Sequence, residues 1–238
     1  MVPSLIFFLA LCLGTVLAFR LPTMPLGNTR SSSHSRLWVA LEPRAEDIVS
    51  EVEMCTFDRA GVVLLAQPGE HDHWLVKAAV FVFEHNEQGT QGVILGKASA
   101  FSLGETAPGI GLFQPNTLFM GGDQGPDMAL MFHKYPLGGY AKYVGGGVDL
   151  GGLRQARELC EARQAAPNDF KFIFNNVQWA PGVLDAEIAA SRWDVVRLPP
   201  DMVLQQKQAS AIWSQARTKL RAAGGKRLHQ DDDYGDDE

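Results

Sequence analysis

A hairpin-like stretch between residues 78 and 95 constrains the fold of this chain more than any other feature. It opens with the uninterrupted apolar run 78–83, turns polar at Glu84, His85 and Asn86, and becomes apolar again after two glycines that lie three residues apart. The pattern predicts a buried strand, a tight turn and a second strand that pairs antiparallel with the first. Because the first run is too apolar for a half-solvated strand, the Glu84-His85 pair is expected at the rim of a core, where charges need partners.

Residues 1–18 have the features of a signal peptide, since the apolar run 5–13 is followed by small residues that end at Ala18. The next segment, 19–41, has three arginines, a run of serines and no acidic residue, which is the composition of a transit peptide. This two-part presequence, with Phe19 at the junction, resembles that of algae whose plastids come from a secondary endosymbiosis. We therefore expect import into the plastid (chloroplast) stroma, with secretion as the alternative. No later stretch approaches the ~18 uninterrupted apolar residues of a membrane span, so no membrane insertion of the mature chain is expected.

The chain that remains after residues 1–41 is acidic. The formal charge of −6 for the whole chain becomes −9, because the presequence holds three arginines and no acid. This charge argues against a nucleic-acid partner, whose phosphates need basic side chains. Six acids lie within 231–238, so residues 225–238 are expected to form a disordered acidic tail. Residues 42–224 then suffice for a single domain with its own core.

Cysteines and catalytic motifs give little support for a reactive site. Cys55 and Cys160 remain after the presequence, and they do not have CxxC spacing. A disulfide framework is therefore excluded, and reduced, buried thiols are expected. The sequence has no GxSxG, P-loop or HExxH motif. No cofactor and no metal are predicted.

Strand-like and helix-like segments alternate through residues 42–224. Short links between the strands favour an α/β fold with a mixed, largely antiparallel sheet that is covered by helices. Residues 96–116 are rich in glycine and proline and are expected to form loops. We expect strands at 61–66, 80–83, 93–95, 118–122, 128–133, 140–144, 170–174 and 193–198, and helices at 43–54, after Asp149 as an N-cap, from Val183, and over 202–223.

The sequence resembles the YqgE/AlgH family from Gly61 to about Leu220. The family motif is an apolar strand, Glu-His-Asn, two glycines three residues apart, a second apolar strand and Asn-Lys-Pro. Gly96 and Ala98 depart from the last element, and Asn175-Asn176 stands where the family has Gly-Tyr. The resemblance implies a single YqgE/AlgH-like domain, most similar to the plant and algal branch, and it implies no established reaction. The matching residues are Pro68, Asp72, Glu84, His85, Asn86, Gly89, Gly92, Lys97, Gly121, Gly122, His133, Trp179, Gly182, Leu184, Asp185, Glu187, Trp193 and Trp213.

Glu84, His85 and His133 are the candidates for a reactive site. Each lies at the end of a predicted strand, and the two strands deliver them to the same rim if the sheet is ordered as the pattern indicates. A carboxylate beside an imidazole fixes its tautomer and raises its basicity, which suits a general base or a metal ligand. The alternative is that these groups satisfy each other and backbone amides at a sheet edge. Asn86 and Lys97 are expected to line or brace the same rim.

The segment 179–187 is a second candidate for a ligand-binding surface. It combines the indole of Trp179, a Pro-Gly turn and the carboxylates of Asp185 and Glu187. Glu187 falls in the first turn of the expected helix, where a negative charge favours the helix dipole. Trp179 either forms the wall of a ligand pocket or packs on the core at the entry of the helix.

Two further patterns resemble known sites only superficially. His71 and His73 flank Asp72, and on a strand both imidazoles would share one face, as a metal site requires. A surface turn capped by Asp72 is the favoured alternative. The glycine-rich segment 143–151 lacks GxGxxG spacing, so it predicts a tight strand-to-helix turn and not a dinucleotide site.

Two classes of function follow from these patterns. The first is a non-enzymatic binding or regulatory protein that acts on an unknown protein or small-molecule partner. The second is a hydrolase-like or metal-assisted enzyme that uses Glu84, His85 and His133. Convergence of these side chains around an open cavity favours the enzyme, whereas a flat or filled rim favours the binding protein.

Overall fold

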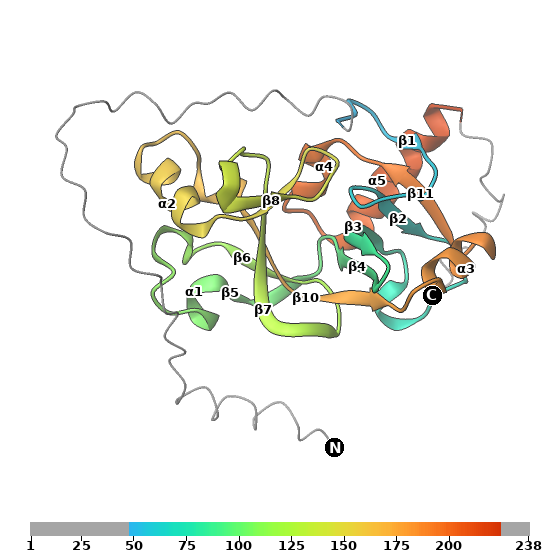
Figure 1. Cartoon of the computed structure of the whole chain (residues 1–238), viewed down its shortest axis with the longest axis horizontal. Coiled ribbons are helices and arrows are strands. Elements are labelled where there is room, and N and C mark those ends of the chain that lie inside the picture. The colour runs from blue at the N-terminus through green and yellow to red at the C-terminus, as the bar shows by residue number, and fades with distance from the viewer. Residues whose placement is uncertain (1–47, 225–238) are drawn as a thin grey trace, which may run out of the picture. The chain divides into compact units, whose positions relative to one another are not determined.

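The computed structural model describes residues 48–224, which form one compact unit (Figure 1). The expected signal peptide, transit-peptide-like segment and acidic tail lie outside the described residues. Within residues 48–224, no helix is long and apolar enough to cross a membrane.

One sheet of eleven strands forms the centre of this unit. The strands are β1 Glu53–Met54, β2 Val63–Ala66, β3 Ala79–Asn86, β4 Gly89–Ile94, β5 Ala98–Ser102, β6 Thr117–Met120, β7 Gln124–His133, β8 Ala141–Tyr143, β9 Asp149–Gly151, β10 Lys171–Trp179 and β11 Trp193–Arg197.

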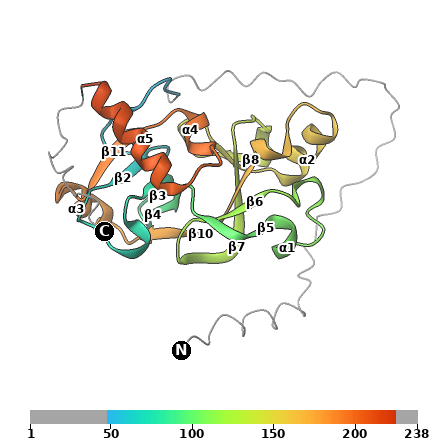
Figure 2. The ribbon, with the colours of Figure 1, turned by 180° about the vertical axis from the view of Figure 1, so that it is seen from behind.

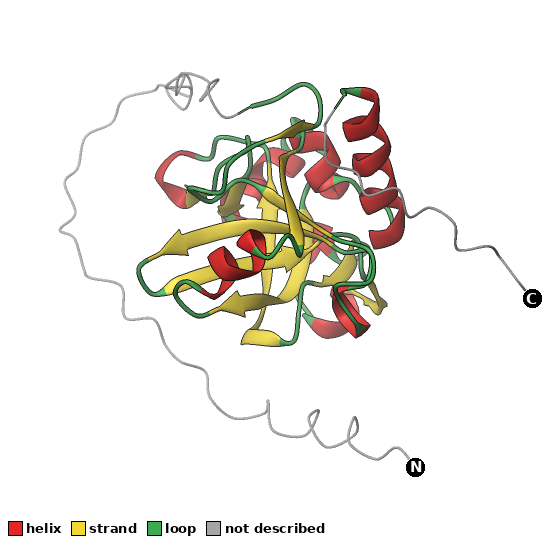
Figure 3. Cartoon of the chain, turned by 90° about the vertical axis from the view of Figure 1, so that its right-hand side faces the viewer, coloured by secondary structure: helices red, strands yellow, loops and turns green. Residues whose placement is uncertain are grey.

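Five described α-helices and four 3-10 helices connect these strands (Figure 3). The α-helices are α1 Leu103–Thr106, α2 Leu153–Glu161, α3 Val183–Ala189, α4 Pro200–Leu204 and α5 Ala209–Ala222, and the 3-10 helices are η2 His73–Leu75, η3 Gly111–Phe113, η4 Gly138–Tyr140 and η5 Pro167–Asp169.

The strand order is β1-β11-β2-β3-β4-β10-β7-β9-β8, with β6 pairing β10 and β5 pairing β6. Every described pairing is antiparallel except that of β6 with β10. The sheet also curls, because Lys142 of β8, at one end of the order, reaches Glu84 of β3 with 3.6 Å between the Nζ and Oε1 atoms. The expected α/β fold with a mixed, largely antiparallel sheet and helices around it is confirmed.

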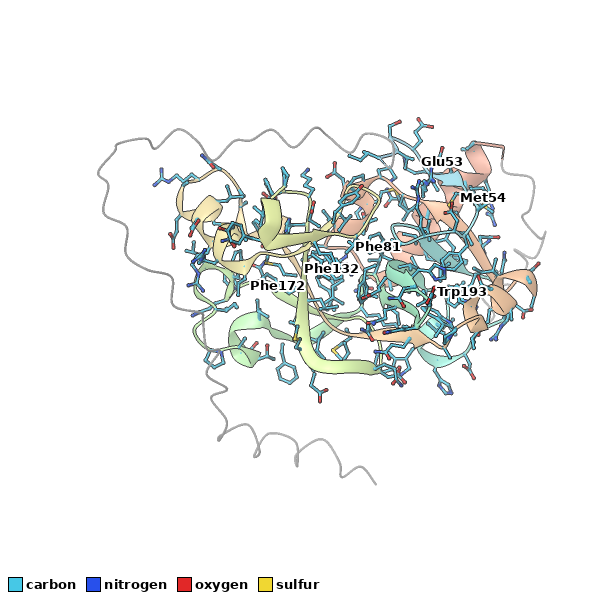
Figure 4. All side chains as sticks on the ribbon, viewed as in Figure 1. Glu53, Met54, Phe81, Phe132, Phe172 and Trp193 are labelled. Atoms are coloured by element: carbon cyan, nitrogen blue, oxygen red, sulfur yellow. The ribbon has the colours of Figure 1, made fainter. Side chains whose placement is uncertain are left out.

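Alternation along β3 divides the interior into two apolar clusters. Ala79 and Phe81 point into the main core, which also contains Phe132 and Ile212, whereas Val80 points to the other face. The rings of Phe81 and Phe132 meet edge to face with 6.1 Å between their centres, and both residues are labelled in Figure 4. The second core contains Val62, Leu64, Val80, Val82, Trp179, Leu184 and Trp193, and a third contains Leu103, Phe113, Met131, Phe170 and Phe172.

Helix α5 closes the main core (Figure 2). The spacing of Ile212, Ala216 and Leu220 predicts one apolar helical face, and all three residues are buried. The expected single helix over 202–223 is nevertheless wrong. The chain leaves helical geometry at Gln205 and begins α5 only at Ala209.

The expected helix over 43–54 is also wrong for the residues that the structure describes. Glu53 and Met54 form β1 and pair with Val196 and Arg197 at the edge of β11. Val52 is buried in the main core. Two apolar residues four positions apart gave a weak helical signal, and pairing with an open sheet edge outweighs it.

The glycine-rich turn joins two strands and not a strand and a helix. Val148 donates its backbone N–H to the carbonyl of Gly145 at 3.0 Å, so the chain returns from β8 into β9. Asp149 therefore lies in β9 and is not a helix N-cap; Gly152 holds that position before α2. The turn also packs on Gly61, where a Cβ atom would lie only 2.6 Å from the Cα atom of Gly145.

Candidate functional site

A β-bulge in β3 sets the direction of Glu84. The pairing with β4 passes from Val82 opposite Gly92 to Glu84 opposite Gln91, which leaves Phe83 as an extra residue. An extra residue interrupts the alternation of faces along a strand. Phe83 packs in the main core, and Glu84 therefore projects on the same side of the sheet, toward β8.

Glu84 lies at the polar end of this face of the sheet. Its carboxylate accepts a hydrogen bond from Asn86 Nδ2 at 3.1 Å and forms an ion pair with Lys142 at 3.6 Å. The Glu84 side chain is 32% exposed. Glu84 lies opposite Gln91 of β4, which in turn lies opposite Gln178 of β10, so three neighbouring strands present polar side chains in one line.

Three side-chain amides extend this line, and we call Gln91, Asn176 and Gln178 the amide row. Asn176 Nδ2 donates to Gln91 Oε1 at 3.0 Å, and Gln178 Nε2 donates to Asn176 Oδ1 at 3.0 Å. Asn176 is buried, whereas Gln178 is exposed. Each bond uses one donor and one acceptor, so Gln91 keeps its amide N–H groups and Gln178 keeps its carbonyl oxygen without a partner among residues 48–224. We call Glu84, Asn86 and the amide row together the polar rim.

His85 points away from the polar rim. Its Nδ1 atom lies 2.8 Å from the hydroxyl oxygen of the buried Thr90. Its ring meets the edge of Phe57 at 4.7 Å, and Phe57 packs against the second core. His85 and Glu84 are thus neighbours in the chain that lie on opposite faces of the sheet.

His133 is fully buried, and both of its ring nitrogens form hydrogen bonds with the backbone. Its Nε2–H donates to the carbonyl of Gly151 at 2.9 Å, and its Nδ1 accepts the backbone N–H of Tyr135 at 3.2 Å. Burial lowers the pKa of His133, and the two backbone bonds only partly oppose this shift. Its ring contacts Phe170 of the third core. The structure therefore brings Glu84 to the polar rim, and it places His85 and His133 in separate apolar surroundings.

Glu187 joins two tryptophans and an arginine. Its Oε2 atom accepts the indole N–H groups of Trp179 at 3.1 Å and Trp193 at 2.8 Å, and its Oε1 atom accepts from Arg192 at 3.1 Å. The two indole rings meet edge to face at 6.2 Å, and Trp193 is labelled in Figure 4. Trp179 packs in the second core. Of the two roles considered for it, its contacts are therefore those of a residue that packs on the core at the entry of the helix.

Replacing Glu187 with glutamine is expected to destabilise the folded protein by about 1–3 kcal/mol, because an amide nitrogen would face donors that now point at a carboxylate oxygen. Unfolding in urea, followed by tryptophan fluorescence, measures the effect. Asp185→Asn is the matched control, since Asp185 is exposed on the same helix, and its effect is expected to stay within about 0.5 kcal/mol. Equal effects of the two substitutions would contradict this account of Glu187.

A hollow with largely apolar walls lies beside Glu187. It is open to solvent, has a volume of about 530 Å³, and is the kind of shallow surface that proteins use for contacts with partners. It is lined by Pro181, Gly182, Val183, Ala186, Glu187, Ala190 and Arg192.

Lys97 and the His71–His73 segment lie away from the polar rim. Lys97 Nζ sits 4.5 Å from the centre of the Trp74 ring, and burial lowers the pKa of Lys97. The His71 ring lies tilted against the Trp193 ring, with 4.1 Å between their centres, and hydrogen-bonds the carbonyl of Arg192, whereas the His73 side chain is 85% exposed. No group of three or more histidine, cysteine, aspartate or glutamate residues within residues 48–224 has the placement needed to hold a metal ion.

Asp72 stands at the N-cap of η2, as the surface-turn interpretation expects, but its side chain makes no capping hydrogen bond. The turn is closed by the backbone instead, because Leu75 donates its N–H to the carbonyl of Asp72 at 3.1 Å.

Sequence reasoning missed two buried polar centres. Lys171 is 1% exposed and donates to the carbonyls of Val203 at 3.1 Å and Gln205 at 2.9 Å. Arg217 and Asp194 form a buried ion pair of 3.1 Å between α5 and β11. A lysine inside the alternating strand 170–174 and an arginine one position after Ala216 were the available signals.

Comparison with known proteins places this geometry in a family. The AlgH-like family (DUF179) matches residues 63–224. A UPF0301 protein of Mycolicibacterium gilvum is 30% identical over 161 residues, which cover 63% of this chain and 76% of that protein. A UPF0301 protein of Methylococcus capsulatus is 25% identical over 173 residues, which cover 70% of this chain and 92% of that protein.

Two solved structures share the fold. A protein from Corynebacterium diphtheriae aligns with a TM-score of 0.58 and 20% identity, over 71% of this chain and 89% of that one. The AlgH protein from Pseudomonas aeruginosa aligns with a TM-score of 0.55 and 18% identity, over 74% of this chain and 99% of that one. The domain match, the sequence relatives and the shared fold agree, and this chain belongs to the AlgH-like family.

Proposed function

We propose that this protein is a non-enzymatic binding protein, and that its polar rim recognises an extended peptide segment of a partner protein. The observation that carries the proposal is the amide row at the end of three paired strands, where the amide N–H groups of Gln91 and the carbonyl oxygen of Gln178 have no partner within the described range 48–224. A peptide backbone offers one acceptor and one donor per residue, and it is the natural complement of such a pair.

The charges around the amide row extend this recognition. Glu84 and Lys142 are both partly exposed, and their charged atoms lie 3.6 Å apart. Each side chain can therefore leave this ion pair and bind an oppositely charged group of a partner. An exposed pair of this kind contributes about 0–1 kcal/mol to stability, which makes the exchange inexpensive. Each hydrogen bond to the amide row would add only about 0.5–1.5 kcal/mol. The rim would therefore supply register and specificity, while apolar contacts supply most of the affinity.

The hydrolase-like or metal-assisted alternative lacks comparable support in residues 48–224. It needs an imidazole near the carboxylate of Glu84, but His85 faces the other side of the sheet and both ring nitrogens of His133 are bonded to the backbone. The thiols are also not activated. Burial raises the pKa of Cys55 to about 11 and raises that of Cys160, so both remain protonated at neutral pH.

Site-specific photo-crosslinking tests the proposal. A benzophenone amino acid replaces Glu87, the exposed neighbour of Asn86, so that the amide row stays intact, and an extract of the source cells is irradiated with the protein. We expect one discrete protein adduct, whose yield falls several-fold when Gln91 is also changed to alanine. Gln114 is the control position, because it is exposed and lies outside the polar rim; a benzophenone there is expected to give no such adduct.

Two results would overturn this proposal. One is equal labelling from positions 87 and 114, which would mean that the polar rim has no preferred partner. The other is turnover of a small ester or phosphate substrate by the purified protein that is lost in the Glu84→Gln and His85→Ala variants but kept in Gln91→Ala. That pattern would favour the enzyme.

A further inference from the structure

Trp74, Val76, Lys77, Lys97 and Lys207 form a surface patch where β3 begins and β4 ends, and we call it the basic patch. Lys97 Nζ lies 4.5 Å from the centre of the Trp74 ring. The backbone of Gly96 packs against that of Lys207, since a Cβ atom added at Gly96 would clash with the Lys207 carbonyl oxygen. Trp74 and Val76 are 47% and 51% exposed. An apolar surface flanked by cations is thus open to solvent.

The lysines of the basic patch have no acidic partner among residues 48–224. The described ion pairs of lysine belong to Lys134 and Lys142, and Lys207 bonds the neutral amide of Gln215 at 3.4 Å. This cluster of positive charge stands in a chain with a formal charge of −6. An indole, a valine and three ammonium groups together are complementary to an acidic segment that carries an aromatic ring.

We propose that residues 231–238 of this chain bind the basic patch. The segment reads Asp-Asp-Asp-Tyr-Gly-Asp-Asp-Glu, with six carboxylates and one tyrosine. The carboxylates pair with Lys77, Lys97 and Lys207, and Tyr234 packs against the exposed faces of Trp74 and Val76. The bound segment covers the exposed indole and supplies carboxylates to lysines that form no ion pair within residues 48–224.

The length of the intervening chain permits this contact. Helix α5 starts beside the patch, since the backbone N atom of Ala209 would lie 2.7 Å from a Cβ atom at Gly96. Its 14 residues extend about 21 Å from there. From Gly224 to residue 231 the chain can span at most about 23–25 Å. The acidic run can therefore return along α5 to the patch.

Tethering favours this occupant over a free acidic peptide. Each exposed ion pair is weak and screened by salt, so a separate peptide would bind poorly. A segment joined by a short linker acts at an effective concentration of the order of millimolar. The contact is expected to form at low ionic strength and to weaken strongly as salt is added.

Zero-length crosslinking with a carbodiimide tests the proposal on the chain from residue 42 to 238. The reagent joins a carboxylate to an amine as an amide, with release of the spent reagent as a urea, and only where the two groups meet. We expect crosslinks from 231–238 to Lys77, Lys97 or Lys207, with a yield that falls about threefold or more in 0.5 M NaCl. Trp74→Ala is expected to lower the yield as well, whereas Lys134→Gln removes an exposed lysine outside the patch and is expected to leave the yield unchanged.

An equal mixture of ¹⁵N-labelled and unlabelled protein identifies the source of the segment. Crosslinks within one isotope support the proposal. Mixed-isotope crosslinks in statistical amounts would overturn it, because the occupant would then be the tail of a second copy. Equal yields at lysines inside and outside the patch, or no crosslink to the patch at low salt, would overturn it too.

Discussion

Replacing Arg217 with methionine is expected to destabilise the folded protein by about 3–5 kcal/mol, because the change leaves the carboxylate of Asp194 buried without its cation. Arg217 and Asp194 are 5% and 6% exposed, and Arg217 Nη2 lies 3.1 Å from Asp194 Oδ2. Gln67 joins the pair, since its Nε2 donates to Asp194 Oδ1 at 2.7 Å and its Oε1 accepts from Arg217 at 2.9 Å. The substitution therefore disturbs a network and not a single contact.

The network fastens α5 to the sheet at one point. Arg217 and Trp213, which lie one helical turn apart, both donate to the carbonyl of Ala66 at the end of β2, at 3.2 and 2.9 Å. The guanidinium carbon also lies 4.8 Å from the centre of the Trp213 ring. The apolar face of α5 fits the main core, and the polar network determines where along the sheet the helix docks.

Chemical unfolding of the variants measures the effect. In Asp194→Leu combined with Arg217→Met, both charges are removed together, and this double variant is expected to recover a large part of the loss. Arg154→Met is the control, because the side chain of Arg154 is 74% exposed and its contacts, with Glu158 on its own helix and with the exposed ring of Tyr140, lie at the surface; we expect a change within about 0.5 kcal/mol. A loss below about 1 kcal/mol for Arg217→Met would show that the pair is not buried as described.

Local patterns sufficed where a single physical rule decided the structure. The apolar run 78–83 and the glycines that follow it correctly predicted the hairpin of β3 and β4, because burial and turn chemistry favoured the same pairing. The strands extend further than expected, since only residues 87 and 88 connect them. The apolar face of α5 was likewise predictable. The N-terminal helix was not, since residues 53–54 exchange weak helical propensity for backbone pairing with β11, a partner that lies more than a hundred residues away in sequence.

The candidate site shows the same limit in finer detail. Glu84 and His85 could be placed near a strand end from the sequence, but the bulge at Phe83 decides which face each side chain takes. A bulge is a property of two paired strands and leaves little trace in one of them. The amide row was equally hidden, because Gln91 and Asn176 are separated by 85 positions and meet only through the pairing of β4 with β10.

The buried side chain of Lys171 explains why the expected C-terminal helix is interrupted. The second large prediction is the effect of this side chain on how stability depends on pH. Its ammonium nitrogen lies beneath the chain that leaves α4, bonds the carbonyls of Val203 and Gln205, and sits 4.9 Å from the centre of the Phe119 ring. The carbonyls of Val203 and Gln205 accept hydrogen bonds from this side chain in place of the backbone N–H groups that would continue the helix. Gln205 accordingly adopts extended backbone geometry. No described ion pair compensates the burial of this amine.

Burial lowers the pKa of Lys171 from 10.5 to about 7 in the folded protein. Between these values the unfolded chain binds a proton that the folded protein does not. The contribution of Lys171 to stability is therefore full above pH 10.5 and is lost as the pH falls to about 7. The slope is about 1.4 kcal/mol per pH unit, so raising the pH from 7.5 to 9.5 is expected to stabilise the parent by about 2–3 kcal/mol relative to Lys171→Met.

Urea unfolding at pH 7.5, 8.5 and 9.5 measures this difference. Lys171→Met also shifts the stability by an amount that does not depend on pH, because two backbone carbonyls lose their donor. Only the pH dependence of the difference reports the titration of the amine. Lys219→Met is the matched control, since Lys219 is exposed on α5; its curve is expected to run parallel to that of the parent. If the Lys171→Met curve is also parallel, the amine stays charged in the folded protein, and its bonds to the two carbonyls and the Phe119 ring outweigh the cost of burying the charge.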